Sequence, residues 1–141
     1  MKKYFIPGLT EHAKDYKWLP KDIDFIDIDW NVLDLKNIKV AKDDIVIGFS
    51  MGAVIAVVLS SKKKVNTVIL CSPSEMSDIN PIKTDQLIII VGEKEEWCLK
   101  NAKRIYRAYK GKKKFIVVPD ADHRISGLYR QTLLDVLEKV S

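Results

Sequence analysis

Short apolar runs alternate with amphipathic segments along the whole of this 141-residue chain. The short runs are rich in isoleucine, valine and leucine and are bounded by turn-forming residues, which is typical of buried strands. Six of them predict strands, at Tyr4–Ile6, Ile23–Ile28, Ile45–Ile47, Thr67–Cys71, Gln86–Val91 and Phe115–Val118. The other segments predict helices, at Glu11–Leu19, at Asn31–Lys42, at an apolar run ending near Ser60, at Trp97–Tyr109 and at Ser126–Val140.

The expected helices differ in how their apolar residues are arranged. Ala53–Leu59 is apolar on every side, so its helix is expected to be buried on most of its surface. Thr10 is the expected N-cap of the helix at 11–19, which Pro20 ends. The last two helices each have one apolar face, formed by Cys98, Ala102, Ile105, Tyr106 and Tyr109 and by Tyr129, Leu133, Val136, Leu137 and Val140.

Strands that alternate with helices predict an α/β fold. We expect one domain over residues 1–141, with a mostly parallel sheet of about six strands and helices on both faces. The continuous apolar run at 86–91 is typical of a central parallel strand. Ser72–Asp85 contains two prolines and several turn formers, which predicts a loop. In such a sheet, functional residues gather beyond the carboxyl ends of the strands.

The composition is that of an ordinary globular protein, with 47% hydrophobic and 30% charged residues. No apolar run is long enough for a membrane helix. The start of the chain places lysines before apolar residues, as a signal peptide does, but Pro7 and Gly8 interrupt the apolar part too early. These features favour a cytoplasmic protein that does not bind membranes.

The net charge of +5 comes largely from two lysine triplets, at 62–64 and 112–114. Each triplet follows an expected helix and precedes an expected strand, where lysines complement a helix C-terminus and solvate a turn. A nucleic-acid surface would interleave aromatic residues or arginines with the lysines, and neither triplet does. We therefore expect no nucleic-acid partner.

The cysteines and histidines are few and far apart in sequence. Cys71 is expected to be buried in a strand, and its distance from Cys98 implies no disulfide framework. The two histidines, His12 and His123, have no metal-ligand spacing to either cysteine, so no metal is expected. His12 lies in a polar segment and is expected at the surface.

The most informative motif lies between the third strand and its helix. Residues 48–52 read Gly-Phe-Ser-Met-Gly, the Gly-x-Ser-x-Gly pattern of a nucleophile elbow. A turn this tight places Ser50 in a sparsely populated backbone conformation, and the flanking glycines avoid steric overlap. The alternatives are a chance match, with Ser50 a plain turn residue, or a phosphate loop. The glycine pattern and lysine of phosphate loops are absent.

An acid and a histidine follow in the order that nucleophile-elbow enzymes use. Glu93, Glu95 and Glu96 come directly after the fifth strand, and His123 comes after the sixth. Both segments leave carboxyl ends of strands, on the same side as Ser50. A serine hydroxyl needs an imidazole to accept its proton, and the imidazole needs a carboxylate to orient it. In the alternative interpretation the glutamates only solvate a helix start and His123 only caps the last helix.

Through the segments 48–52, 92–96 and 119–123 the sequence resembles the α/β-hydrolase family. The resemblance extends over nearly the whole chain, from Lys3 to the last helix. The resemblance implies Ser50 as nucleophile, His123 as base, and Glu95 as acid, three residues after the glycine that ends the penultimate strand. Most members have aspartate at the acid position, so glutamate is a departure, and Glu93 and Glu96 remain alternatives. Asp120 replaces the glycine of the common Gly-Ala-x-His segment. No cofactor is implied.

The resemblance also implies an oxyanion hole made by two backbone N–H groups. These are the N–H of Met51 and the N–H of Leu9, which follows the glycine turn after the first strand. Pro7-Gly8 stands where family members often have His-Gly, and backbone donors do not require that histidine. Trp30 and Trp97 are expected either in an acyl pocket or in the core. Asp120 and Asp122 are expected as loop residues.

A small, capless serine hydrolase is the function that this resemblance implies. The chain begins where the third strand of the family would be, and the stretch at 72–85 is too short for a cap. Such a minimal fold predicts an open, shallow site for a small ester or thioester with a short acyl group. The alternatives are a non-catalytic ligand- or protein-binding module on the same scaffold, and acyl transfer to an acceptor other than water.

Overall fold

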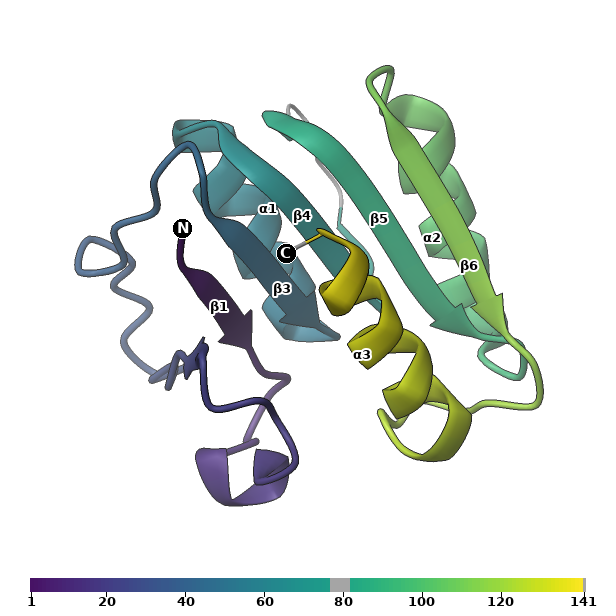
Figure 1. Ribbon diagram of the computed structural model, residues 1–141. Coiled ribbons are helices and arrows are strands. Elements are labelled where there is room, and N and C mark those ends of the chain that lie inside the picture. Colours follow the sequence, from purple (N-terminus) through teal and green to yellow (C-terminus); the bar gives the residue numbers. More distant parts are fainter. Residues whose placement is uncertain (77–81, 141) are drawn as a thin grey trace.

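The computed structural model describes residues 1–76 and 82–140 as a six-stranded sheet covered by helices (Figure 1). All adjacent strands are parallel, in the order β2-β1-β3-β4-β5-β6. This confirms the α/β class, and the sheet is wholly parallel rather than mostly so. The strands are β1 (Lys3–Ile6), β2 (Ile23–Phe25), β3 (Ile45–Phe49), β4 (Val65–Cys71), β5 (Thr84–Gly92) and β6 (Lys113–Val118).

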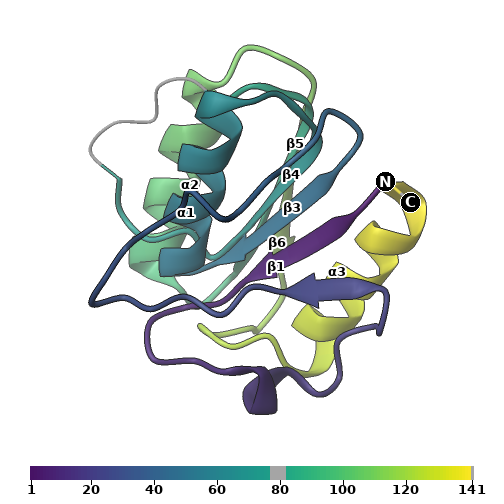
Figure 2. The same ribbon diagram turned by 90° about the vertical axis from the view of Figure 1, so that its left-hand side faces the viewer.

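Helices cover both faces of the sheet, as the sequence predicts. Figure 2 shows α1 and α2 together on one face and α3 on the other. A short 3₁₀ helix, η1, lies on the α3 side, where its Tyr16 joins the core beneath α3. The bounds are η1 (Ala13–Tyr16), α1 (Met51–Lys62), α2 (Glu96–Ala108) and α3 (Gly127–Val140).

Alternate residues of the central strands pack into the two opposite cores. In β4, Val68 and Leu70 face α1 and α2, whereas Ile69 and Cys71 face α3. The same alternation runs along β5, and side chains that project from both faces are what makes these strands continuously apolar. α1 is apolar all round, and most of its residues are buried, as expected.

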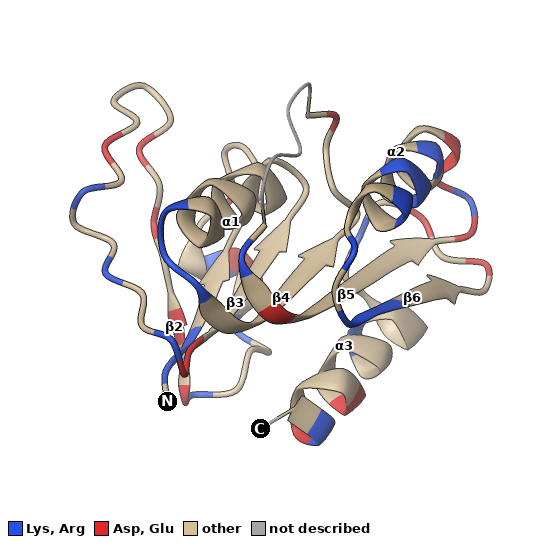
Figure 3. Cartoon of the chain, turned by 90° about the horizontal axis from the view of Figure 1, so that it is seen from above, with Lys and Arg blue, Asp and Glu red and all other residues tan. Residues whose placement is uncertain are grey.

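α1 and α2 lie on the same face but differ in charge. Figure 3 shows α1 almost without charged residues, whereas lysine and arginine follow α2. At the end of α2, the Lys113 ammonium donates to the carbonyls of Tyr106 and Tyr109, 2.7 and 2.9 Å away. One lysine of the second triplet therefore complements a helix C-terminus, as the sequence predicts.

The helix expected at Asn31–Lys42 is wrong. The structure describes this whole segment, and it consists of turns without a helix. Asp29 and Asp34 each accept a backbone N–H two residues ahead, at 3.0 Å, and such local bonds compete with helix formation. Of the apolar residues that favoured a helix, Val32 and Leu33 are exposed, whereas Leu35 and Ile38 pack partly buried against the core.

The helix expected at Glu11–Leu19 is reduced to the single turn of η1. Thr10 is not its N-cap, because Thr10 has φ of 62° and His12 occupies that position in an extended conformation. The Glu11 side chain turns back instead and accepts the N–H of Gly8 at 2.7 Å and the hydroxyl of Tyr16 at 2.6 Å.

The remaining differences are at element ends. β2 stops at Phe25 rather than Ile28, and β5 begins at Thr84, inside the expected loop at 72–85. Residues 77–81 of that loop lie outside the described residues. Among the described residues, no helix is both long and apolar enough to span a membrane.

Candidate active site

Ser50 lies in the sharp turn between β3 and α1. It has φ of 58° and ψ of −118°, the sparsely populated conformation expected from the sequence. Gly52 permits this turn because a Cβ there would overlap the carbonyl oxygens of Ile6 and Pro7. A Cβ at Gly48 would likewise overlap the backbone where α1 begins. The strand and the helix therefore approach each other more closely than any residue with a side chain permits.

The loops after β5 and β6 bond to each other and so position His123. Glu93 N–H donates to the carbonyl of Val118 at 2.9 Å, and Lys94 N–H donates to that of Ala121 at 3.0 Å. In return, Asp120 N–H donates to the Glu93 carboxylate at 2.9 Å. These bonds join the two loops beside the carboxyl ends of their strands.

Glu95 is a buried carboxylate held by two donors. Its side chain is 4% exposed, and Oε2 accepts the N–H of Gly92 at 2.7 Å and the hydroxyl of Ser72 at 2.6 Å. The hydroxyl of the fully buried Tyr129 lies 2.8 Å from the Ser72 oxygen and donates to the carbonyl of Ile90 at 3.0 Å. This network directs the other carboxylate oxygen, Oε1, toward His123.

The structure brings Ser50, His123 and Glu95 together from three loops far apart in sequence. The two ring nitrogens of His123 contact the other two residues, with Nε2 3.0 Å from Ser50 Oγ and Nδ1 against Glu95 Oε1. The ring of Phe49 packs against the imidazole, with centroids 5.0 Å apart. This arrangement can pass a proton from the hydroxyl to the imidazole while the carboxylate stabilises the charged ring.

The other two candidate acids lie elsewhere. Glu93 is exposed and accepts the N–H of Asp120, and Glu96 is exposed at the start of α2. Among the three glutamates, only Glu95 contacts His123.

The environment of His123 favours its protonated form. Hydrogen bonds with Cys98 and with the Glu95 carboxylate raise the pKa of His123 to about 10, and these outweigh partial burial, which lowers it. Cys98, on the first turn of α2, has its Sγ 3.6 Å from Nδ1 of the ring.

The two backbone N–H groups expected in an oxyanion hole flank Ser50 in different ways. Met51 is the first residue of α1, so its N–H has no acceptor within the helix. Leu9 follows Gly8, whose Cβ, if present, would lie 3.4 Å from Cβ of Ser50. Neither N–H has a hydrogen-bond partner among residues 1–76 and 82–140.

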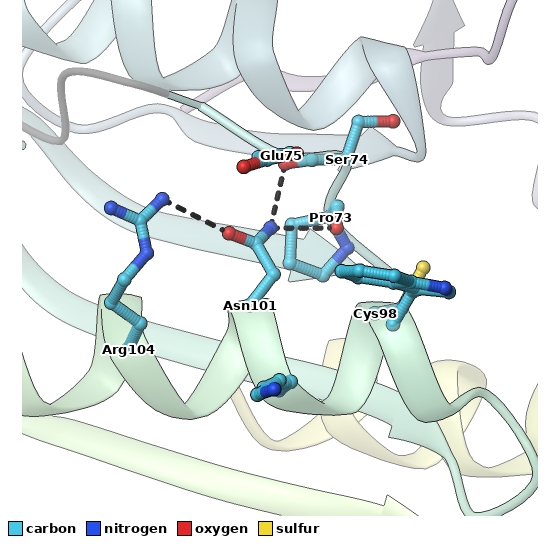
Figure 4. A pocket seen from close by; sticks show the side chains of 8 residues that line it. Pro73, Ser74, Glu75, Cys98, Asn101 and Arg104 are labelled. Carbon is cyan, nitrogen blue, oxygen red and sulfur yellow. Dashed lines mark hydrogen bonds between the residues drawn. The ribbon is translucent and has the colours of Figure 1, made fainter.

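A pocket of about 360 Å³ adjoins these residues, between the loop after β4 and α2 (Figure 4). At its near end, Ser74 Oγ lies 3.4 Å from Ser50 Oγ, and Ser74 N–H donates to the Ser50 carbonyl. Along the pocket, Asn101 donates to the carbonyls of Pro73 and Ser74, 3.0 and 2.7 Å away, and so fixes the loop on the helix. Lys100 and Arg104 also line the pocket.

The two candidate tryptophans have different positions. Trp97 lines the pocket and is 81% exposed, whereas Trp30 packs partly buried against the core. His12 is exposed, as expected. Asp120 and Asp122 are exposed loop residues that pair with Lys94 and Arg124, also as expected.

Sequence reasoning missed Ser72, Tyr129, Ser74 and Cys98. Tyr129 was expected only as an apolar contact of the last helix, and the two serines appeared only as members of a loop. A single sequence gives no signal for their roles, because each depends on a contact between elements. The sequence separation of the cysteines and histidines was also misleading, since the fold places Cys98 beside His123.

No protein-family model and no curated protein sequence matches the chain. Solved structures do match it in fold. An uncharacterized protein from Bacillus cereus superposes with a TM-score of 0.65 at 16% identity, over 99% of this chain and 60% of that one. Dienelactone hydrolase from Anabaena variabilis gives 0.54 at 19% identity, over 68% of this chain and 46% of that one. Human thioesterase 2 gives 0.65 at 11% identity, over 99% and 94%.

The fold is therefore that of the α/β-hydrolases, as the sequence predicts. The chain spans less than two thirds of the length of the Bacillus and Anabaena proteins and nearly the full length of the human one. At these identities the similarity establishes the architecture, and the chemistry rests on the side chains of this chain.

Proposed function

We propose that this protein is a serine hydrolase that cleaves a small ester or thioester through an acyl-enzyme intermediate. The observation that supports it most is the continuous contact from Ser50 Oγ through His123 to the buried Glu95 carboxylate. Chance would rarely place these three groups, in this order, at the carboxyl edge of a parallel sheet and beside a helix N-terminus.

In the first half of the reaction, Ser50 Oγ attacks the carbonyl carbon of the substrate. Nε2 of His123 accepts the hydroxyl proton, and Glu95 stabilises the imidazolium that forms. The backbone N–H groups of Met51 and Leu9 donate to the oxyanion, which also lies at the positive end of α1. His123 then gives its proton to the leaving alcohol or thiol, and Ser50 retains the acyl group.

In the second half, water replaces the leaving group. His123 accepts a proton from water, hydroxide attacks the acyl carbon, and the carboxylic acid leaves as Ser50 regains its proton. None of these steps requires a cofactor.

The adjoining pocket supports a small substrate. Its volume of about 360 Å³ is at the low end of the range for small-molecule sites, roughly 300–1,000 Å³. Its lining combines Pro73 and the exposed Trp97 with polar groups. We expect short acyl esters or thioesters to react fastest.

The test is hydrolysis of a series of p-nitrophenyl esters and the matching thioesters, with pre-steady-state measurements. A burst of nitrophenol equal to the enzyme concentration, followed by slower turnover, is expected for short acyl groups and indicates an acyl-enzyme. The Ser50→Ala variant should show neither phase. A rate that peaks at long acyl groups would contradict the small-substrate proposal. No turnover of any ester or thioester by folded protein would favour the binding-module alternative.

A further inference from the structure

Glu95, Cys98 and His123 place a carboxylate oxygen, a thiol sulfur and a ring nitrogen within 4.8 Å of one another. Among the described residues, this is the only group of three such ligands. We propose that these residues bind a thiophilic divalent cation, of which Zn²⁺ is the representative, and that the bound cation switches off His123. The inference goes beyond the proposed hydrolase activity, because the cation site exists whether or not the protein turns over an ester.

The distance between sulfur and nitrogen matches a zinc site. With tetrahedral bonds of about 2.3 Å to sulfur and about 2.0–2.1 Å to nitrogen, the two ligand atoms lie about 3.6 Å apart. Cys98 Sγ and His123 Nδ1 are 3.6 Å apart. The separation of these two ligand atoms is therefore already that of a shared zinc ion.

The third ligand needs a small movement. Glu95 Oε1 contacts Nδ1 directly, and a shared zinc ion widens that separation to about 3.4 Å. Glu95 is fixed by Gly92 and Ser72, so the movement falls on His123, whose side chain is 45% exposed. Water completes the coordination as the fourth ligand.

The ligand types select the class of cation. A thiolate and an imidazole favour zinc and other thiophilic ions, whereas magnesium and calcium require oxygen ligands. The hydrogen bonds that anchor Glu95 orient this ligand for the cation, as such bonds do in known metal sites.

Cation binding is incompatible with His123 acting as a base. In the proposed reaction, Nδ1 carries a proton toward Glu95, and the lone pair of Nε2 accepts the proton of Ser50. A cation on Nδ1 takes the place of that proton, and the neutral imidazole then carries its hydrogen on Nε2. The Cys98 thiol releases its proton to solvent as its sulfur binds. Ser50 is left without a proton acceptor.

Direct binding tests the site without any need for activity. Zn²⁺ is titrated calorimetrically into the Ser50→Ala protein, which keeps all three ligands, and into the double variants Ser50→Ala/Cys98→Ser and Ser50→Ala/His12→Asn. We expect one Zn²⁺ per chain, affinity at least tenfold weaker without Cys98, and unchanged affinity without His12. The His12 variant is a matched control because that residue also faces a carboxylate, with Nδ1 3.9 Å from Asp27.

A spectroscopic measurement identifies the ligand atom. Cd²⁺ bound to the Ser50→Ala protein should produce the ultraviolet charge-transfer band of a cadmium–thiolate bond, which should be absent in the Cys98→Ser double variant. Mg²⁺ should neither bind nor displace Cd²⁺. Equal Zn²⁺ affinity with and without Cys98, or loss of binding in the His12 variant instead, would overturn the proposal.

If the protein also hydrolyses esters, the consequence for activity can be measured. Zn²⁺ should inhibit the unmodified protein, and a chelator should restore the rate. In Cys98→Ser, at least tenfold more Zn²⁺ should be needed for half inhibition, with each rate compared to the same variant without metal. Binding of Zn²⁺ without inhibition would contradict only the claim that the cation stops His123 from acting as a base. If the protein hydrolyses no ester, the proposed function fails, and the calorimetric titration still decides whether the cation site exists.

Discussion

The two sides of the His123 ring face parts of the molecule that are built differently. On the Nε2 side, Ser50 is held by backbone geometry, with a positive φ in a turn that glycine makes possible. On the Nδ1 side, Glu95 is held by the N–H of Gly92 and by a side-chain network of Ser72 and Tyr129. The position of Ser50 is therefore determined by a local sequence motif, whereas that of Glu95 depends on contacts among segments far apart in sequence.

The difference shows how each half tolerates change. Backbone geometry fails through steric overlap, which disturbs folding and function together. A buried hydrogen-bond network fails by leaving a polar group without its partner, which costs about 1–3 kcal/mol while the fold persists. Substitutions on the two sides should therefore separate loss of activity from loss of stability.

The largest effect is expected from Ser50→Ala. If Ser50 is the nucleophile, its removal should lower kcat/KM by about 10⁴-fold or more, the loss typical of triad enzymes. Steady-state hydrolysis of a p-nitrophenyl ester measures it. Ser74→Ala is the matched control, since its hydroxyl lies 3.4 Å away and is expected to change the rate by less than about tenfold. A larger loss in Ser74→Ala than in Ser50→Ala would contradict the assignment of Ser50 as the nucleophile.

Glu95→Gln should follow, with kcat lowered by about 10³-fold because an amide neither stabilises the imidazolium nor fixes the productive tautomer. KM should change little, as the residue does not face the pocket. Glu93→Gln provides the comparison and should remain within about threefold of the unmodified protein. Equal effects of the two substitutions on kcat would contradict the assignment of Glu95 as the acid that orients His123.

Gly52→Ala disturbs the backbone turn that holds Ser50. The added methyl group overlaps the carbonyl oxygens of Ile6 and Pro7, so the free energy of unfolding should fall by about 3 kcal/mol or more. Urea denaturation followed by circular dichroism measures the change. Gly8→Ala should cost less, because its added Cβ meets the end of the Glu11 side chain. Equal stability of Gly52→Ala and the unmodified protein would show that the turn is not so constrained.

Ser72→Ala disturbs the side-chain network that holds Glu95. It removes one of the donors to the Glu95 carboxylate, and the loss is expected to be about 1–3 kcal/mol. Both the free energy of unfolding and kcat should fall, with KM nearly constant. If the hydroxyl of Ser72 only fills space, its removal should lower stability and leave kcat unchanged. An unchanged kcat would therefore contradict the orienting role of Ser72.

The last effect concerns pH. Below its pKa, which is raised to about 10, His123 is protonated and cannot accept the Ser50 proton, so kcat/KM should rise with pH across the neutral range. Cys98→Ala removes the first cause of the raised pKa, so the rise should move to lower pH. The same profile in both proteins would exclude the thiol as a determinant.

Protonation of His123 also affects folding. Its pKa in the folded protein lies above the unfolded value of 6.5, so the protonated ring stabilises the fold below that pH. This stabilisation is lost as pH rises through about 10. Thermal unfolding of Glu95→Gln, compared with the unmodified protein at low and high pH, measures the contribution.

Much of the fold could be predicted from sequence, because it follows from short-range patterns. The runs that form β3, β4 and β5 are apolar throughout, since alternate residues enter opposite cores. The N-terminal connection was less predictable. Asp34 and Glu11 use their side chains to bond nearby N–H groups, and these bonds override a weak helical pattern.

The candidate site was predictable where chemistry follows a motif. Gly48–Gly52 contains the serine turn, and the positions after β5 and β6 placed an acid and His123 at the same edge. The contact between Cys98 and His123 was not predictable, since it depends on how α2 begins relative to a loop 25 residues away. The network behind Glu95 joins β4, β5 and α3, and no local pattern encodes such contacts.

The most direct test of the catalytic assembly is covalent labelling with a fluorophosphonate, followed by intact-mass and peptide mass spectrometry. The reagent reacts with a serine only where a base activates its hydroxyl. A single adduct on Ser50 is expected, present in Ser74→Ala, slowed in Glu95→Gln and absent in Ser50→Ala. Folded protein that remains unlabelled, or an adduct on a serine other than Ser50, would contradict the assembly of Ser50, His123 and Glu95 into a working nucleophile.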